Sequence, residues 1–252
     1  MPRAPPVTTK RALRGKTHLT RNGKAARAFD SRILRAGRHQ FTLCAMKKLI
    51  KGIIEFRRSR SAEVRELFAQ LALGQKPDCL FLACSDSRVA ANVFASTDPG
   101  DLFVVRNLGN IMPPAPDTGS AVAGLEYALN VLKVRHIVVC GHSDCGAIRA
   151  LADDPKLEGG TPLTAWLRHA RSSGDGGWQD LDRVSQRNVA VQLANLRTHP
   201  LVREREARGE VRLHGIWFHI RHAEVHYLEQ EPDHFVLIDD LEGLRILERM
   251  TD

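Results

Sequence analysis

The sequence predicts a single α/β domain with a mainly parallel central β-sheet flanked by helices, and three observations support this class. Short apolar runs, typical of strands buried on both faces, occur at 79–83, 102–105 and 137–140. A segment with helical apolar spacing, 120–132, separates the second and third runs, as a crossover between parallel strands requires. The chain has 252 residues, 43% of them hydrophobic, which suffices for one buried core.

Two amphipathic helices are expected to form an N-terminal helical arm at 46–75. In the first helix, apolar residues recur at helical spacing among lysines: Leu49, Ile50, Ile53 and Ile54. The second helix covers 62–73 and is ended by the Gly-Gln-Lys-Pro sequence that follows it. The α/β core is expected at 76–252.

The later part of the core contains one more long helix and two more strands. The helix is expected at 183–196, and the strands at 210–218 and 234–238.

Residues 1–45 are expected to form a basic, disordered extension. They hold eleven of the 37 Lys and Arg and one of the 29 acidic residues, which leaves 46–252 with a net charge of −2. Three explanations stay open. An organellar targeting peptide would be Arg-rich, as this segment is, but also Ser-rich, and Ser31 is the only serine in residues 1–45. A nucleic-acid or membrane-binding arm would use the charge. We favour the third explanation, in which translation starts at Met46 and the residues before it are a misassigned extension.

The five cysteines indicate metal binding or catalysis rather than a disulfide framework, because their number is odd and the chain is large enough to fold without disulfides. Free cysteine is among the most buried residue types, so we assign Cys79 and Cys140 to the core and set Cys44 aside in the extension. No apolar run approaches the roughly 18 residues of a membrane span. We therefore expect a cytoplasmic protein with no membrane partner.

Polar motifs follow the first and third predicted strands. Cys-Ser-Asp-Ser-Arg occupies 84–88, and His-Ser-Asp-Cys-Gly occupies 142–146. Ligand sites in open α/β sheets form outside the carboxyl ends of the strands, so Cys84, His142 and Cys145 are expected to meet. Two thiolates and an imidazole suit zinc, and a catalytic zinc keeps its fourth position for water or substrate.

In their order and separation, these motifs resemble the two signature motifs of the β-class carbonic anhydrases, and the segments 100–107 and 119–127 resemble that family as well. The resemblance implies reversible hydration of carbon dioxide to bicarbonate and a proton by a zinc-bound hydroxide. It implies one Zn²⁺ per chain, held by Cys84, His142 and Cys145. It also implies a homodimer or a dimer of dimers, with the N-terminal helices lying across the partner.

Asp86 and Arg88 are the catalytic pair that the resemblance implies. Arg88 can bind the Asp86 carboxylate through two parallel hydrogen bonds and keep it ionised beside the metal's open position. In a closed state of the site, Asp86 can itself become a fourth zinc ligand. The alternative is an ordinary surface ion pair, which the flanking ligands disfavour.

The resemblance also places Gln75, Phe103, Tyr127 and Gly146 in the substrate pocket. An amide that donates to a substrate oxygen beside an apolar wall suits a small nonpolar molecule that becomes an anion. For Phe103 and Tyr127, core packing is the alternative.

Some family members have a second, inhibitory bicarbonate pocket built from tryptophan, arginine and tyrosine. The matching residues here are Phe81, Arg106 and Phe218. Only the arginine is retained, so allosteric inhibition by bicarbonate is not expected.

Two other functions stay open on the sequence. The same ligands can support hydrolysis of a carbon dioxide analogue such as carbonyl sulfide or carbon disulfide. A structural-zinc binding protein with a basic nucleic-acid-binding tail belongs to another class. Structural zinc normally takes four protein ligands and the positive charge ends before the fold begins, so the core is not expected to bind nucleic acid.

Overall fold

The computed structural model describes residues 45–59, 61–229 and 234–250. These residues belong to one unit, Gly37–Asp252. The other unit, Met1–Ala36, lies outside the described residues, as do Cys44 and all of the expected basic extension except Ala45.

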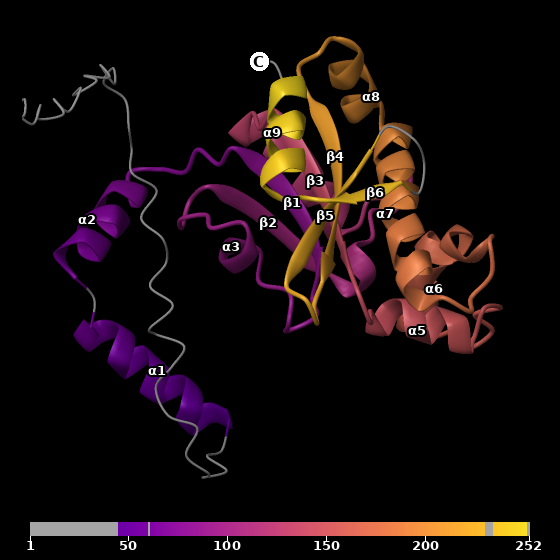
Figure 1. Ribbon diagram of the computed structural model, residues 1–252, viewed down its shortest axis with the longest axis horizontal. Coiled ribbons are helices and arrows are strands. Elements are labelled where there is room, and N and C mark those ends of the chain that lie inside the picture. Colours follow the sequence, from indigo (N-terminus) through magenta and orange to yellow (C-terminus); the bar gives the residue numbers. More distant parts are fainter. Residues whose placement is uncertain (1–44, 60, 230–233, 251–252) are drawn as a thin grey trace, which may run out of the picture. The chain divides into compact units, whose positions relative to one another are not determined.

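A six-stranded sheet forms the centre of the core, in the strand order β2-β1-β3-β4-β5-β6 (Figure 1). Four neighbouring strands are parallel: β2 (Leu102–Asn107), β1 (Cys79–Cys84), β3 (His136–His142) and β4 (Arg212–His219). Two antiparallel strands extend the sheet beyond β4: β5 (Glu224–Leu228) and β6 (Phe235–Leu237). The predicted mainly parallel α/β class is therefore confirmed.

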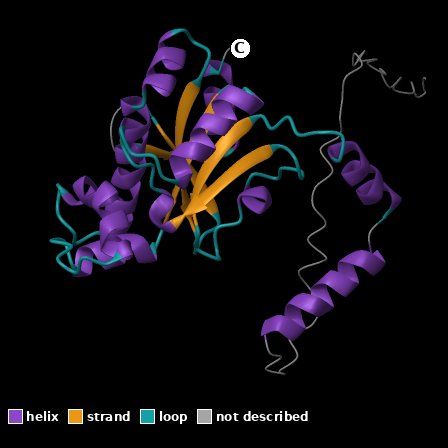
Figure 2. Ribbon diagram, turned by 180° about the vertical axis from the view of Figure 1, so that it is seen from behind, coloured by secondary structure: helices purple, strands orange, loops and turns teal. Residues whose placement is uncertain are grey.

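Helices of the core flank the strands on both sides (Figure 2). The bounds of the helices are α1 (Ala45–Ser59), α2 (Ala62–Leu71), α3 (Ala91–Phe94), α4 (Ser120–Tyr127), α5 (Gly146–Asp153), α6 (Pro162–Leu167), α7 (Leu181–Thr198), α8 (Pro200–Ala207) and α9 (Asp240–Arg249). Short 3-10 segments occur at Leu108–Asn110 and Arg168–Gly174. Among the described residues, no helix is both long and apolar enough to cross a membrane.

The two faces of the sheet pack against different helices. On one face, Leu80, Leu82 and Ile137 join a core cluster with buried residues of α4 and α7. On the other face, Phe81 and Cys140 pack with residues in and around α3. All six residues of β1 are buried, which explains why its sequence is one continuous apolar run.

The predicted crossover helix at 120–132 is confirmed, although its last turn is not α-helical. The α4 helix continues into a π-helical turn, Ala128–Leu132, and Lys133 ends it in the left-handed conformation with φ = 58°. The predicted helices at 62–73 and 183–196 correspond to α2 and α7, and α2 ends two residues earlier than expected.

The arm helices expose their apolar side chains. In α1, Leu49, Ile50, Ile53 and Ile54 are between 44% and 56% exposed, and α2 has no buried residue. Phe56 and Phe68 meet edge to face, with ring centroids 6.4 Å apart. Exposure of this much apolar surface is unusual for a helix that has no partner.

The strand order creates a crevice at the carboxyl ends of β1 and β3. β1 lies between β2 and β3. The connection from β1 therefore runs to β2 at one edge of the sheet, whereas the connection from β3 runs to β4, toward the opposite edge. Loops that diverge in this way leave the space in which open α/β sheets bind ligands. Both polar motifs begin at this point.

Candidate metal centre

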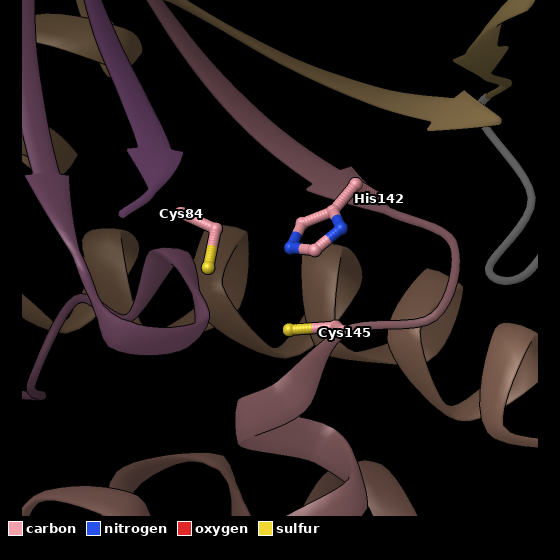
Figure 3. Close-up of side chains that lie close together, drawn as sticks. All are labelled: Cys84, His142 and Cys145. Carbon is pink, nitrogen blue, oxygen red and sulfur yellow. The ribbon is translucent and has the colours of Figure 1, made fainter. Parts of the chain in front are cut away.

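Cys84, His142 and Cys145 converge in the crevice between β1 and β3 (Figure 3). Cys84 ends β1, His142 ends β3, and Cys145 immediately precedes α5. Their ligand atoms lie within 4.8 Å of one another, and all three residues are buried. The predicted ligand set is thus brought together, and no other group of three such side chains occurs in the part of the chain that the structure describes.

The imidazole of His142 is prepared to bind a metal through Nε2. Its Nδ1 lies 2.9 Å from the backbone oxygen of Ser143. Because a carbonyl only accepts hydrogen bonds, Nδ1 carries the proton and Nε2 keeps a free lone pair. Nε2 is fully buried and has no hydrogen-bond partner in the protein. A buried nitrogen without a partner, beside two sulfurs, fits a zinc ligand.

The two thiols influence each other's ionisation. A hydrogen bond from Cys145 lowers the pKa of Cys84, and the backbone N–H of Gly109, 3.4 Å from the sulfur, acts in the same direction. The pKa of Cys145 is raised, because its side chain is hydrogen-bonded to Cys84 and is itself buried. A divalent cation between the sulfurs would stabilise the second thiolate as well as the first.

Cys79 and Cys140 are core residues, as expected. Burial, assisted by Asp78 and Asp101, raises the pKa of Cys79 to about 11. Burial likewise raises the pKa of Cys140, which is completely enclosed between strands. Both stay protonated thiols at neutral pH.

Asp86 and Arg88 form a two-point ion pair beside the ligands. Arg88 donates from Nε and Nη2 to the two carboxylate oxygens of Asp86 at 2.9 and 2.8 Å, and its backbone N–H donates to Oδ1 at 2.9 Å. These hydrogen bonds hold the pKa of Asp86 far below its ordinary value. Both carboxylate oxygens of Asp86 are therefore engaged by Arg88.

The loop that carries Asp86 is fixed from β2 by Arg106. Its Nε and Nη2 donate to the backbone oxygen of Cys84 at 3.1 and 2.9 Å, and Nη2 also donates to the backbone oxygen of Asp86 at 2.7 Å. The carbonyl of Cys84 belongs to the last residue of β1 and that of Asp86 to the loop after it, and Arg106 satisfies both. Arg106 is thus engaged with the protein itself.

Phe81 and Phe218, which match the other two positions of the inhibitory bicarbonate pocket, belong to an aromatic cluster. The ring of Phe94 is stacked on that of Phe218, with centroids 4.6 Å apart, and lies 6.3 Å from that of Phe81. The surroundings of these residues are apolar. Phe81 and Phe218 stand where the inhibitory pocket has tryptophan and tyrosine, and their side chains have no polar group that could bind an anion.

Three of the four residues matched to the substrate pocket lie at the opposite end of the sheet from the chain's own ligands. Phe103 pairs with Leu80, four residues before Cys84, which corresponds to about 13 Å along a strand. Tyr127 packs on Phe103, with ring centroids 5.7 Å apart. Gln75 precedes β1 and is exposed. The chain alone does not bring these three residues to Cys84, His142 and Cys145.

Gly146, the fourth, is next to the ligands. It is the first residue of α5, directly after Cys145, and a Cβ at this position would meet nothing within 4 Å. The glycine is thus not required by packing, and its backbone N–H belongs to the first turn of a helix, where anions are stabilised.

The sequence did not identify several groups that hold the ligands in place. Ser185 of α7 donates to the backbone oxygen of His142 at 2.7 Å and accepts a hydrogen bond from Trp217 Nε1 at 3.2 Å. A serine inside the apolar pattern of 183–196 was the available signal. Nothing in the sequence indicates that the N–H of Gly109 donates to the Cys84 sulfur, because this contact joins segments that are distant in sequence.

Together the fold and the ligands define a class: a parallel α/β protein with a buried Cys₂His zinc site of the catalytic type, which has three protein ligands. A structural site would need a fourth protein ligand, and none joins the group in the described ranges. The structural-zinc alternative is therefore not favoured.

Comparison with known proteins agrees with this class. The carbonic anhydrase family model matches residues 79–225. A carbonic anhydrase of Pseudomonas aeruginosa is 40% identical over 200 residues, which cover 76% of this chain and 91% of that protein. A carbonic anhydrase of Synechococcus elongatus is 39% identical over 191 residues, covering 71% of this chain and 70% of that protein.

Solved structures give the same result. The β-carbonic anhydrase CcaA superposes with a TM-score of 0.71 at 38% identity, covering 77% of this chain and 92% of that one. One of two tetrameric β-carbonic anhydrases from Sordaria macrospora superposes with a TM-score of 0.64 at 30% identity, covering 73% and 96%. The chain belongs to the β-carbonic anhydrase family, and it is a zinc enzyme of that family.

Proposed function

We propose that this chain catalyses the reversible hydration of carbon dioxide, with zinc held by Cys84, His142 and Cys145. The observation that carries the proposal is the convergence of these three buried side chains, with His142 Nε2 left without a partner, at the crevice between β1 and β3. When bound, zinc supplies the Lewis acidity that makes water a nucleophile near neutral pH, an effect whose standard example is carbonic anhydrase itself.

Asp86 and Arg88 are the proposed catalytic pair. The Asp86 carboxylate, kept ionised by Arg88, accepts a hydrogen bond from the attacking water and so directs an oxygen lone pair toward the substrate carbon. The backbone N–H of Gly146, in the first turn of α5, donates to the oxygen on which negative charge develops.

We further propose that a second copy of the chain completes the substrate pocket in a homodimer or a dimer of dimers. Phe103 pairs with Leu80 and Tyr127 packs on Phe103, far along the sheet from Cys84, so the pocket that Gln75, Phe103 and Tyr127 are proposed to line is that of another copy. The exposed apolar side chains of α1 give the chain a surface to bury in such an assembly. The Sordaria macrospora relatives are tetrameric.

A complementation experiment tests this shared site. Gln75→Ala removes an exposed side chain and is expected to slow hydration, whereas Cys145→Ser is expected to abolish it. If the site is shared, each mixed dimer of the two variants contains one intact site out of two and regains up to half of the wild-type rate. If Gln75 served its own chain, neither site would be intact and mixing would restore nothing.

The metal assignment is tested by zinc content and rates. Cys145→Ser is expected to lose stoichiometric zinc together with carbon dioxide hydration. Retention of both would refute the ligand set. Rates on carbon dioxide and on carbonyl sulfide, measured side by side with the wild-type protein, separate a carbonic anhydrase from a hydrolase of the analogue.

We also propose a cytoplasmic location, because two cysteine ligands and two further free cysteines suit a reducing compartment. Residues 1–45 are proposed to be dispensable, because the elements that build the site all follow them. Deletion of residues 1–45 is expected to leave zinc content and the hydration rate unchanged. A slower or zinc-poor deletion variant would show that the extension contributes to the fold or the site.

A further inference from the structure

Asp144 lies in the sequence between the two proposed zinc ligands His142 and Cys145, and it contacts Arg88. Arg88 Nη1 donates to Asp144 Oδ2 at 2.9 Å, and Nη2 donates to the backbone oxygen of Asp144 at 3.0 Å. The same guanidinium donates from Nε and Nη2 to Asp86. Arg88 is therefore held between two carboxylates, one from the loop after β1 and one from the loop after β3.

Asp144 is itself held firmly by groups outside the catalytic pair. Its backbone N–H donates to Oδ1 of Asp182, in the first turn of α7, at 2.9 Å. Arg149 of α5 binds its other carboxylate oxygen. Its backbone is left-handed, with φ = 53°, a conformation that aspartate adopts more readily than most residues. The side chain that meets Arg88 is thus fixed by the two helices that follow the zinc ligands.

Arg88 needs such an anchor, because its side chain is 43% exposed. A long, exposed side chain paired with one carboxylate gains little from the pair, since the attraction is screened and side-chain entropy is lost. A second carboxylate that binds a different edge of the guanidinium restricts its rotation and fixes the direction of the Nε edge. That edge is the one that holds Asp86.

We propose that Asp144 is a positioning residue for this reaction: it fixes Arg88, and through Arg88 it keeps the Asp86 carboxylate directed at the attacking water rather than bound to the metal. This inference rests on the proposed role of Asp86 and Arg88. The hydrogen bonds of Asp144 go to Arg88, Asp182 and Arg149, and its proposed effect on catalysis passes through Arg88.

The test is a double-mutant cycle on the full chain with zinc bound. Asp144→Ala is expected to keep one zinc per chain and to lower kcat about tenfold, less than the loss from Arg88→Ala, because Asp86 remains present but is poorly directed. Adding Asp144→Ala to Arg88→Ala should lower kcat no further. Asp144→Asn keeps an oxygen acceptor for Arg88 and should recover part of the rate. Asp153→Ala, an exposed aspartate in α5, is the matched control and should have the wild-type rate.

A second measurement does not depend on the rate. With Co²⁺ in place of zinc, the visible spectrum reports the ligands of the metal. Asp144→Ala should change this spectrum, because a released Asp86 can reach the metal, and adding Asp86→Asn should remove the change.

The outcomes separate the two levels of the proposal. Wild-type turnover in Arg88→Ala would refute the catalytic pair itself. A slow Arg88→Ala with a wild-type Asp144→Ala, or losses that multiply in the double variant, would refute only the positioning role. Loss of zinc from Asp144→Ala would also overturn it, since Asp144 would then serve the metal loop rather than Arg88.

Discussion

The two ends of β1 and β3 carry the same residue types and behave differently. β1 begins with Cys79 and ends with Cys84, and β3 begins with His136 and ends with His142. At the carboxyl end of β1, hydrogen bonds from Cys145 and from the backbone N–H of Gly109 lower the pKa of Cys84. At the amino end of β1, burial and two carboxylates raise the pKa of Cys79 to about 11.

The histidines differ in the same way. His142 Nε2 has no partner in the protein and faces two sulfurs. At the other end of the sheet, His136 Nδ1 lies 3.0 Å from His214 Nε2, and His214 Nδ1 lies 3.1 Å from the hydroxyl of Tyr227. Both nitrogens of His214 are therefore used within the fold. The comparison teaches that the position on the sheet, not the residue type, decides which cysteine and which histidine bind metal.

The largest expected effect comes from replacing the two cysteines of β1 one at a time. Cys84→Ser should lose zinc and at least a thousandfold in the hydration rate, because the site loses a thiolate ligand. Cys79→Ser should keep both and unfold with about 1–3 kcal/mol less free energy, because a hydroxyl replaces a buried thiol. Metal analysis, stopped-flow rates and denaturant unfolding measure these differences. Equal zinc loss in both variants would contradict the assignment of Cys79 to the core.

The next effect compares carboxylates at the two ends. Asp86→Asn should keep zinc and slow hydration about a hundredfold, because the neutral amide no longer directs the attacking water as the carboxylate does. Asp101→Asn, beside Cys79, should have the wild-type rate. Stopped-flow measurements at saturating carbon dioxide decide between them. A wild-type rate for Asp86→Asn would return the Asp86–Arg88 pair to a structural role.

The smallest effect concerns His214 and pH. Burial first, and then His136 and Arg212, lower the pKa of His214 from 6.5 to about 4. Between these values the folded chain binds fewer protons than the unfolded chain, so stability falls as the pH falls. From pH 7.5 to 5, the wild type should lose about 1 kcal/mol more unfolding free energy than His214→Gln, a figure reduced for the partial exposure of the ring. Denaturant unfolding at both pH values measures this difference. Equal losses would show that His214 titrates normally.

The sequence predicted the class and the ligands because β1 and β3 are continuous apolar runs that each end at a polar motif. It predicted the strand at 234–238 but not β5, whose Glu-Val-His-Tyr-Leu sequence is half-buried throughout and mixes polar with apolar residues. It also missed α9, which exposes Leu241, Leu244 and Leu247.

The details of the site could not be predicted, because they depend on contacts between distant segments. Nothing local to Arg106 indicates that it binds the carbonyl of Cys84, and nothing local to Asp144 indicates that it reaches Arg88. The sequence match proposed Gln75, Phe103 and Tyr127 for the substrate pocket but did not indicate that they lie at the other end of the sheet. Only the strand register separates these residues from their own zinc ligands.

The segment from α5 to the start of α7 leaves the metal centre and returns to it. It departs after Cys145, and both its ends are tied together: Asp144 N–H bonds Asp182, and Ser185 bonds the carbonyl of His142. The exposed Gly159 and Gly160 lie midway along this excursion, and Gly160 has φ = 59°. Chain breaks and inserted sequences are tolerated best at exposed tips whose flanks are fixed. This tip is therefore a natural place to graft a peptide or open the chain for circular permutation without moving a ligand.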